Sequence, residues 1–122
     1  MHRPHHKDYV AQGYAAEREG RLADAARLYR KAIREGDDYS FNNLAQLLIE
    51  QNRLTEGEKL FRRGAKAGDS LAARNLVLFL LEQGREADAK RALAVAQRLG
   101  APPTRRDMAE SRSYFRDSAG ES

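Results

Sequence analysis

Cysteine is absent from the 122 residues, and histidine is confined to His2, His5 and His6. Without cysteine the chain has neither a disulfide framework nor a thiolate metal site. No nucleophile with an orienting acid accompanies the three histidines, so nothing here is typical of a catalytic set. His2 and His6 could hold a stray metal ion, but without fixed supporting groups they are better interpreted as part of a flexible tail. We therefore expect a non-enzymatic protein without a cofactor.

Long apolar runs and internal prolines are equally scarce. The longest apolar run covers residues 76–81, whereas a helix needs about 20 apolar residues to cross a bilayer. No apolar segment follows the first seven residues, so neither a signal peptide nor a membrane anchor is predicted, and a cytoplasmic location is the default. The prolines, Pro4, Pro102 and Pro103, lie outside the helical patterns, and sustained strand-like alternation is absent. The sequence predicts one all-α domain.

Glycine recurs at an interval of 32 residues, at Gly36, Gly68 and Gly100. A spacing of about 20 to 50 residues marks a stacked repeat protein, in which no unit can bury its apolar face alone. Each of these glycines ends a helical run, where a left-handed residue is needed. Three similar turns recur at the same interval, over residues 20–25, 52–57 and 84–89. The chain is thus predicted to contain three helix–turn–helix units.

Apolar residues within each unit follow the spacing of one helical stripe. The stripe of the second unit comprises Phe41, Leu44, Ala45 and Leu48, and that of the third comprises Ala73, Leu76, Val77 and Leu80. These two helices are predicted to begin at Asp38 or Ser40 and at Asp69 or Ser70, because aspartate and serine cap helix N-termini. Glycine at position 13 and alanine at position 45 would let neighbouring helices approach closely.

A shorter helix is predicted after the third unit. Thr104 and Asp107 have the spacing of a capping box, and Met108 and Phe115 fall on one side of the helix that follows. Such a helix would cover the apolar flank of the last unit. The expected organisation is a flexible tail over residues 1–6, repeats over 7–37, 38–69 and 70–101 in a domain spanning 7–116, a capping helix over 104–116 and a disordered tail over 117–122.

The second unit carries the motif of a known repeat. The motif consists of Phe41, Leu44, Ala45, Leu48, the turn Asn52-Arg53-Leu54, Gly57, Phe61 and Gly64. It resembles the tetratricopeptide repeat, and residues 67–72 leading to Asn75 are similar to Sel1-like repeats. The resemblance covers about residues 7–101 and implies an α–α superhelix, or solenoid, that acts as a protein-binding adaptor or scaffold. The family favours alanine at positions 57 and 64, so the glycines predict a helix that is locally soft or closely packed.

By this resemblance, the first helices of successive repeats line a concave groove that binds a peptide or a partner helix. The expected groove residues are Tyr14, Tyr39, Asn42, Asn43, Gln46, Ile49, Leu71, Arg74, Asn75, Leu78 and Leu81. Amide side chains can pair with the backbone of a peptide, and leucines can accept an apolar side chain. Asparagine before leucine is also a framework feature of such repeats, so this second interpretation stays open for Asn43 and Asn75.

Residues 76–81 are apolar around the whole helix, which requires cover on more than one side. The cover is either internal, from the next helix and from Met108 and Phe115, or external. In the second case Leu78 and Leu81 form an adhesive patch for a partner helix or for self-association. Both possibilities are left open by the sequence.

Basic residues favour a rival function, because the net charge is +4 and the sequence pI is about 9.6. Two rows recur on the second helices: Arg27, Lys59 and Arg91, and Arg34, Lys66 and Arg98. An outer face of this kind could associate with nucleic acid. However, Asp24, Glu56 and Asp88 precede the first row by three residues, and Asp37 and Asp69 follow the second by three. Local ion pairs are therefore expected to offset much of the charge, and no aromatic residues join the rows for stacking.

Overall fold

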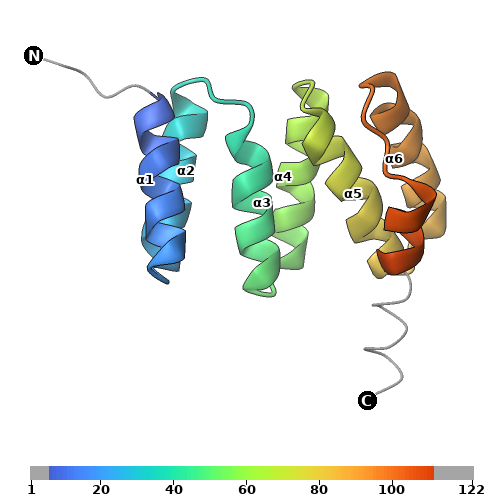
Figure 1. The fold of residues 1–122 in the computed structure, drawn as a ribbon, viewed down its shortest axis with the longest axis horizontal. Coiled ribbons are helices and arrows are strands. Elements are labelled where there is room, and N and C mark those ends of the chain that lie inside the picture. Colours follow the sequence, from blue (N-terminus) through green and yellow to red (C-terminus); the bar gives the residue numbers. More distant parts are fainter. Residues whose placement is uncertain (1–5, 112–122) are drawn as a thin grey trace, which may run out of the picture. The chain divides into compact units, whose positions relative to one another are not determined.

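The structure is a computed structural model that describes residues 6–111 (Figure 1). Its helices are α1 (His6–Arg18), α2 (Leu22–Arg34), α3 (Ser40–Glu50), α4 (Leu54–Lys66), α5 (Ser70–Glu82), α6 (Glu86–Arg98) and a short helix over residues 105–111. No strand occurs between residues 6 and 111. The predicted all-α fold of three helix pairs followed by a shorter helix is thereby confirmed. Phe115, part of the predicted capping helix, and the predicted terminal tails beyond residues 6–111 lie outside the described residues.

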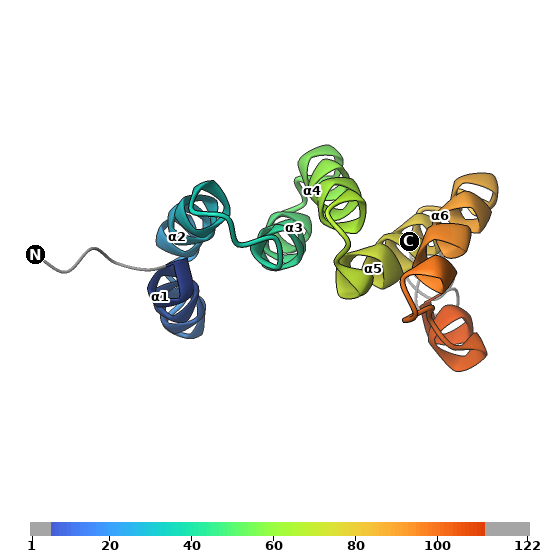
Figure 2. The same cartoon turned by 90° about the horizontal axis from the view of Figure 1, so that it is seen from above.

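The chain divides into two compact units, Met1–Gly64 and Ala65–Ser122. In the first unit α1 packs on α2 and α2 packs on α3. In the second unit α5 packs on α6, and Ser111 of the short helix contacts α5 through a hydrogen bond to the Leu78 carbonyl. The side-by-side pairing of α1 with α2 and of α5 with α6 is visible in Figure 2. Neighbouring helices thus pack in succession, as a helical repeat requires.

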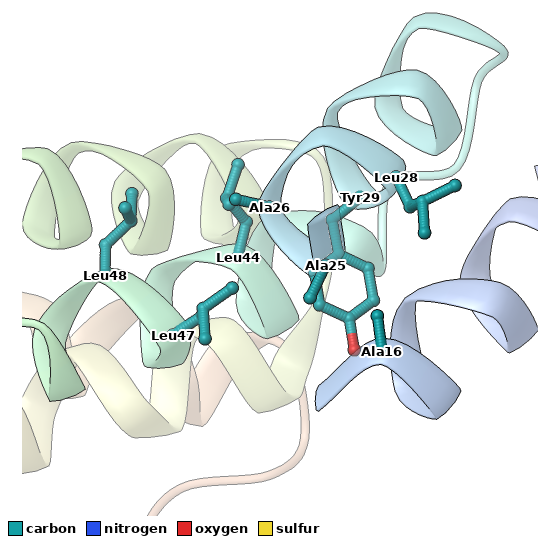
Figure 3. Close-up of a cluster of buried hydrophobic side chains, with 8 residues drawn as sticks. All are labelled: Ala16, Ala25, Ala26, Leu28, Tyr29, Leu44, Leu47 and Leu48. Atoms are coloured by element: carbon teal, nitrogen blue, oxygen red, sulfur yellow. The ribbon is translucent and has the colours of Figure 1, made fainter. Parts of the chain in front are cut away.

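A cluster of alanine, leucine and tyrosine side chains forms the core of the first unit (Figure 3). Its members are Ala16, Ala25, Ala26, Leu28, Tyr29, Leu44, Leu47 and Leu48. The alanines keep the helices close together, and the ring of Tyr29 fills the space that they leave. In the second unit the core residues come mainly from α5 and α6, among them Leu76, Val77, Leu80, Ala89 and Ala96.

Two glycines show how closely the helices of a pair approach. A Cβ atom on Gly13 of α1 would lie 2.5 Å from Cε1 of Tyr29 on α2. A Cβ atom on Gly57 of α4 would lie 2.5 Å from Cγ1 of Ile49 and 3.1 Å from the carbonyl oxygen of Ala45, both on α3. Of the two interpretations offered for Gly57, the structure therefore supports close packing.

The ends of the helices agree with the predicted repeat. Gly36, Gly68 and Gly100 have φ angles of 98°, 97° and 83°, so each terminates a helix in the left-handed region as expected. The turns inside the pairs also use this region, with a φ of 63° at Asn52, which the sequence analysis did not predict. Asparagine is the non-glycine residue that tolerates this conformation best.

Aspartate side chains accept hydrogen bonds at the starts of α3 and α5. The carboxylate of Asp69 accepts a hydrogen bond of 3.0 Å from the backbone N–H of Leu71, as its predicted capping role requires. Helix α3 begins at Ser40, one of its two predicted starts. The aspartate that accepts hydrogen bonds there is Asp37 rather than Asp38, from the Tyr39 N–H (3.0 Å) and the Ser40 hydroxyl (2.9 Å). Asp37 precedes Asp69 by one repeat length, so the repeat itself was the better guide.

The predicted capping box is present before the short helix. The Thr104 N–H donates to Asp107 Oδ2 over 2.8 Å, and the Asp107 N–H donates to the Thr104 hydroxyl over 3.0 Å. These reciprocal bonds satisfy two N–H groups that a helix start otherwise leaves without partners.

Candidate partner-binding site

Two exposed tyrosines and an asparagine come together on one face of the first unit. Tyr39, just before α3, is 71% exposed, and Tyr14 on α1 is 46% exposed. The Asn43 side-chain amide of α3 donates a hydrogen bond of 3.1 Å to the Tyr14 hydroxyl. Tyr39 and the exposed Gln46 lie about one helical turn before and after Asn43, hence on the same side of α3. We refer to Tyr14, Tyr39, Asn43 and Gln46 as the tyrosine face.

Tyr14 is held by the core beneath it. Its ring meets the ring of Tyr29 edge-on, with 5.9 Å between the ring centroids. Tyr29 is buried, and its hydroxyl donates a hydrogen bond of 2.5 Å to the carboxylate of Glu17. Burial and this hydrogen bond raise the pKa of Tyr29 well above its ordinary value. The exposed ring of Tyr14 therefore rests on a fixed neighbour, which limits the side-chain freedom that binding would remove.

The pair formed by Glu17 and Tyr29 was not predicted from the sequence. The signal was a single difference between repeats, because Glu17 occupies the position that holds Ile49 in the second repeat and Leu81 in the third. A carboxylate among apolar counterparts indicates that a polar partner is nearby.

Two residues predicted to face the groove in the first unit point elsewhere. Asn42 is only 3% exposed, so its side chain cannot meet a partner in this conformation. Ile49 is half-buried and packs where a Cβ atom of Gly57 would lie. Successive residues of a helix point about 100° apart. The groove residues predicted on α3 therefore covered a wider arc of the helix than its exposed face does.

The corresponding face of α5 in the second unit is covered by the short helix over residues 105–111. The Arg74 guanidinium lies 3.1 Å from the Asp107 carboxylate. The Ser111 hydroxyl is shared between the Leu78 carbonyl and the Glu82 carboxylate, 3.0 Å from each. Hydrogen bonds from Thr104, and then the charge of Arg74, hold the pKa of Asp107 below its ordinary value. Arg74 and Leu78, both predicted to bind a partner, thus contact this chain's own helix.

The cover of residues 76–81 is found inside the second unit. Leu81 is 7% exposed and lines a pocket of about 180 Å³ with α6 residues and Met108. Leu78 and Asn75 are half-buried, and of the five predicted groove residues on α5 only Leu71 is exposed. Internal cover through Met108 agrees with one of the two predictions, whereas an adhesive patch that includes Leu81 is wrong.

Ion pairs offset only part of the positive charge of the two basic rows. As predicted, Asp24 pairs with Arg27 over 3.6 Å and Asp88 pairs with Arg91. Each turn arginine also pairs with the acid three residues on, in a pattern that the sequence analysis missed: Arg21 with Asp24 (3.1 Å), Arg53 with Glu56 (2.7 Å) and Arg85 with Asp88 (2.8 Å). The last two of these turn pairs are also linked by paired hydrogen bonds.

The remaining basic residues lack the predicted neutralisation. Glu56 is bound to Arg53, and no ion pair of Lys59 is found within residues 6–111. Asp37 and Asp69, the acids predicted to pair with the second row, instead accept hydrogen bonds from backbone N–H groups at helix starts. The described part of the chain shows no ion pair for Arg34 or Lys66, nor for Arg98, for which no acid partner was predicted. Local pairing is thus confirmed for Arg27 and Arg91 but not for the others.

Comparison with known proteins adds no family: no protein-family model and no curated protein matches the chain. The relation to tetratricopeptide and Sel1-like repeats therefore stays a prediction from the motif. Among the helices in residues 6–111, none combines the length and apolar character needed to cross a membrane. The same residues contain no group of three acidic or histidine side chains that could hold a metal ion.

Proposed function

We propose that this chain is a non-enzymatic protein-interaction module, an adaptor of the tetratricopeptide or Sel1-like kind, that binds a peptide on the tyrosine face. The observation that carries the proposal is the exposure of Tyr14, whose hydroxyl is bonded to the Asn43 amide, and of Tyr39, about one helical turn before Asn43. A cytoplasmic location belongs to the same proposal.

The chemistry of the tyrosine face suits a peptide. Tyrosine is enriched at protein interfaces because its ring buries a large apolar area while its hydroxyl keeps a polar partner. The hydrogen bond to Tyr14 uses an N–H of Asn43 and leaves its amide oxygen as an acceptor for a peptide N–H. Tyr39 would supply most of the new contact area. Among the large hydrophobic residues described as exposed, which are Tyr14, Tyr39 and Leu71, its exposed fraction is the highest.

The first unit is the better site because its face is open. In the second unit Arg74 and Leu78 are engaged by Asp107 and Ser111. A partner at that position would first have to displace the short helix, whereas the tyrosine face needs no such rearrangement. The four residues of the tyrosine face include no cation, which argues against a phosphate backbone as its ligand.

A selected peptide tests the proposal. Peptides from a displayed library are selected on the wild-type chain, and their affinities are measured by fluorescence anisotropy. The double variant Tyr39→Ala with Asn43→Ala should bind the selected peptide at least about 10-fold more weakly, as expected when interface anchors are truncated. The matched control is Leu71→Ala with Asn75→Ala, which changes the same repeat positions in the second unit and should bind within about twofold of wild type.

Three results would refute this function. The first is an equal loss of affinity in both double variants, with circular dichroism showing both folded. The second is the absence of any selected peptide in a chain that sediments as a dimer or larger species, which would instead support self-association. The third is tight binding of random RNA that is lost on the tyrosine-face variant.

A further inference from the structure

The first unit contains a second concave region, a cleft of about 390 Å³ between α2, α3 and α4. Its lining residues are Arg30, Ile33, Arg34, Leu44, Leu48, Glu56, Lys59, Leu60 and Arg63, and we call it the basic cleft. Leu44 and Leu48 lie about 100° and 140° around α3 from Asn43, given 3.6 residues per turn. The basic cleft is therefore separate from the tyrosine face, and its volume is within the range of ligand sites in proteins.

Both walls of the basic cleft carry a pair of cations. Arg30 and Arg34 lie one helical turn apart on α2, and Lys59 and Arg63 lie one turn apart on α4. No ion pair involving any of these four side chains is found among residues 6–111. The guanidinium of Arg63 lies over the ring of Phe41, 4.7 Å from its centroid, which restrains it at the rim.

The only acid in the lining does not neutralise these cations. Glu56 accepts hydrogen bonds of 3.0 and 2.7 Å from the guanidinium of Arg53, which lies in the turn before α4. Its charge is thus already offset by a residue outside the lining. Four positive charges remain around one cleft, a local excess that attracts an anionic ligand.

The floor of the basic cleft is aliphatic. By floor we mean the apolar part of the lining, which comprises the half-buried Ile33 and Leu60 and the buried Leu44 and Leu48. No aromatic residue is part of the lining. A ligand that fits must therefore bring bulky apolar groups to the floor and negative charges to both walls.

We infer that the basic cleft binds an acidic amphipathic segment of a partner protein, with leucine-like side chains on the floor and aspartate or glutamate toward each wall. Carboxylates one helical turn apart on such a segment match the spacing of Arg30 and Arg34 and of Lys59 and Arg63. A fatty acid has one carboxylate and would leave most of the cations without a partner. A nucleic acid has no leucine-sized aliphatic side group for the floor and would find no ring in the lining for its bases to stack on.

The probe is a fluorescein-labelled helical peptide with two leucines one turn apart, flanked on both sides by glutamates. Two altered peptides accompany it, one with glutamine for every glutamate and one with serine for both leucines. With the full chain at fixed salt, each altered peptide should bind at least about 10-fold more weakly than the probe, and affinity for the probe should fall as salt rises.

Charge reversal on both walls locates the binding. The variant Arg34→Glu with Lys59→Glu should bind the probe at least about 10-fold more weakly than wild type. The matched control is Arg98→Glu with Arg105→Glu, in the second unit, which lowers the net charge of +4 by the same amount. Arg98 lies in the last turn of α6, as Arg34 does in α2, so the two variants reverse a cation at the same place in a helix. The control should bind the probe within about threefold of wild type.

Several outcomes would overturn the inference. These are no binding of the probe to the folded chain, equal losses in the two charge-reversal variants, or undiminished binding of the serine peptide. Tighter binding of palmitate or of a thymidine 16-mer than of the probe, abolished by Arg34→Glu with Lys59→Glu, would assign the basic cleft to another ligand class. The variant Tyr39→Ala with Asn43→Ala should still bind the probe, so the two sites succeed or fail separately.

Discussion

The first and second units place equivalent positions of the repeat in different surroundings. In the first, Tyr14 of α1 is exposed and its hydroxyl accepts a hydrogen bond from the Asn43 side chain of α3. In the second, the equivalent residue, Leu78, is half-buried, and its carbonyl accepts a hydrogen bond from Ser111. The short helix occupies the register of a further first helix, since Asp107 corresponds to Asn43 by two repeat lengths. The repeat pattern thus continues one helix beyond its third pair.

The two units also fill the centre of a helix pair differently. The first combines Gly13 with Tyr29, whereas the second has Val77 and Leu93 at the equivalent positions. In the first unit the large ring of Tyr29 faces a residue without a side chain, and in the second a leucine takes the place of the ring and a valine that of the glycine. Both combinations fill a similar volume. The tyrosine brings a hydroxyl into the core, and Glu17 accepts its hydrogen bond where the second unit has Leu81.

Leu81→Ser should produce the largest loss of stability. Leu81 is buried and lines a pocket with α6 residues and Met108, so truncation enlarges a cavity and buries a hydroxyl, at a cost of about 3 kcal/mol. Leu78→Ser, at a half-buried site, should cost about 1 kcal/mol. Urea unfolding followed by circular dichroism measures both. Equal and small effects would restore the interpretation of both leucines as an exposed patch.

Gly13→Ala should destabilise the first unit by about 2 kcal/mol. The added methyl would overlap the ring of Tyr29, which costs about 3 kcal/mol when the neighbour cannot move. The gain in helix propensity returns about 1 kcal/mol. In a Tyr29→Leu background, which imitates the second unit, the same substitution should be neutral or stabilising by up to about 1 kcal/mol. A loss of equal size in both backgrounds, measured by urea unfolding, would show that Tyr29 is not the obstacle.

Acid should release the short helix from α5, with the smallest effect on the whole chain. The pKa of Asp107 is lower in the folded chain than its ordinary value, so its contribution to stability is present above about pH 4 and is lost as pH falls through the folded value. The protection of the amides of residues 105–111, taken relative to the intrinsic exchange rate at each pH, should therefore fall below about pH 4. Asp107→Asn should exchange quickly at neutral pH and lack this transition. Identical titrations of the two proteins would exclude Asp107 as the cause.

Much of the fold could be predicted because it depends on local rules. The glycines at helix ends, the cap at Asp69 and the box formed by Thr104 and Asp107 involve residues within a few positions of each other. The site was harder to predict. Tyr14, Tyr39 and Gln46 are exposed and Asn43 bonds to Tyr14, but the burial of Asn42 and Leu81 depends on which neighbouring helix lies over each side chain.

Charge was the weakest part of the prediction. Spacing along the chain correctly paired Arg27 with Asp24, but it also paired Lys59 with Glu56, which the structure assigns to Arg53. An acid with cations three residues away on both sides has two partners within reach, and sequence spacing does not choose between them. Because Glu56 pairs with Arg53, Lys59 in the basic cleft has no ion pair among residues 6–111.

The sequence by itself determined the helices, their caps and turns and the 32-residue register, because backbone conformation and apolar periodicity are set by near neighbours in the chain. Only the tertiary structure decided that Tyr29 packs against Gly13 and bonds to Glu17, and that the short helix covers Leu78. It also brought Arg30, Arg34, Lys59 and Arg63 around one aliphatic floor. Burial and charge proximity depend on distances in space between separate helices, which no spacing along the chain specifies.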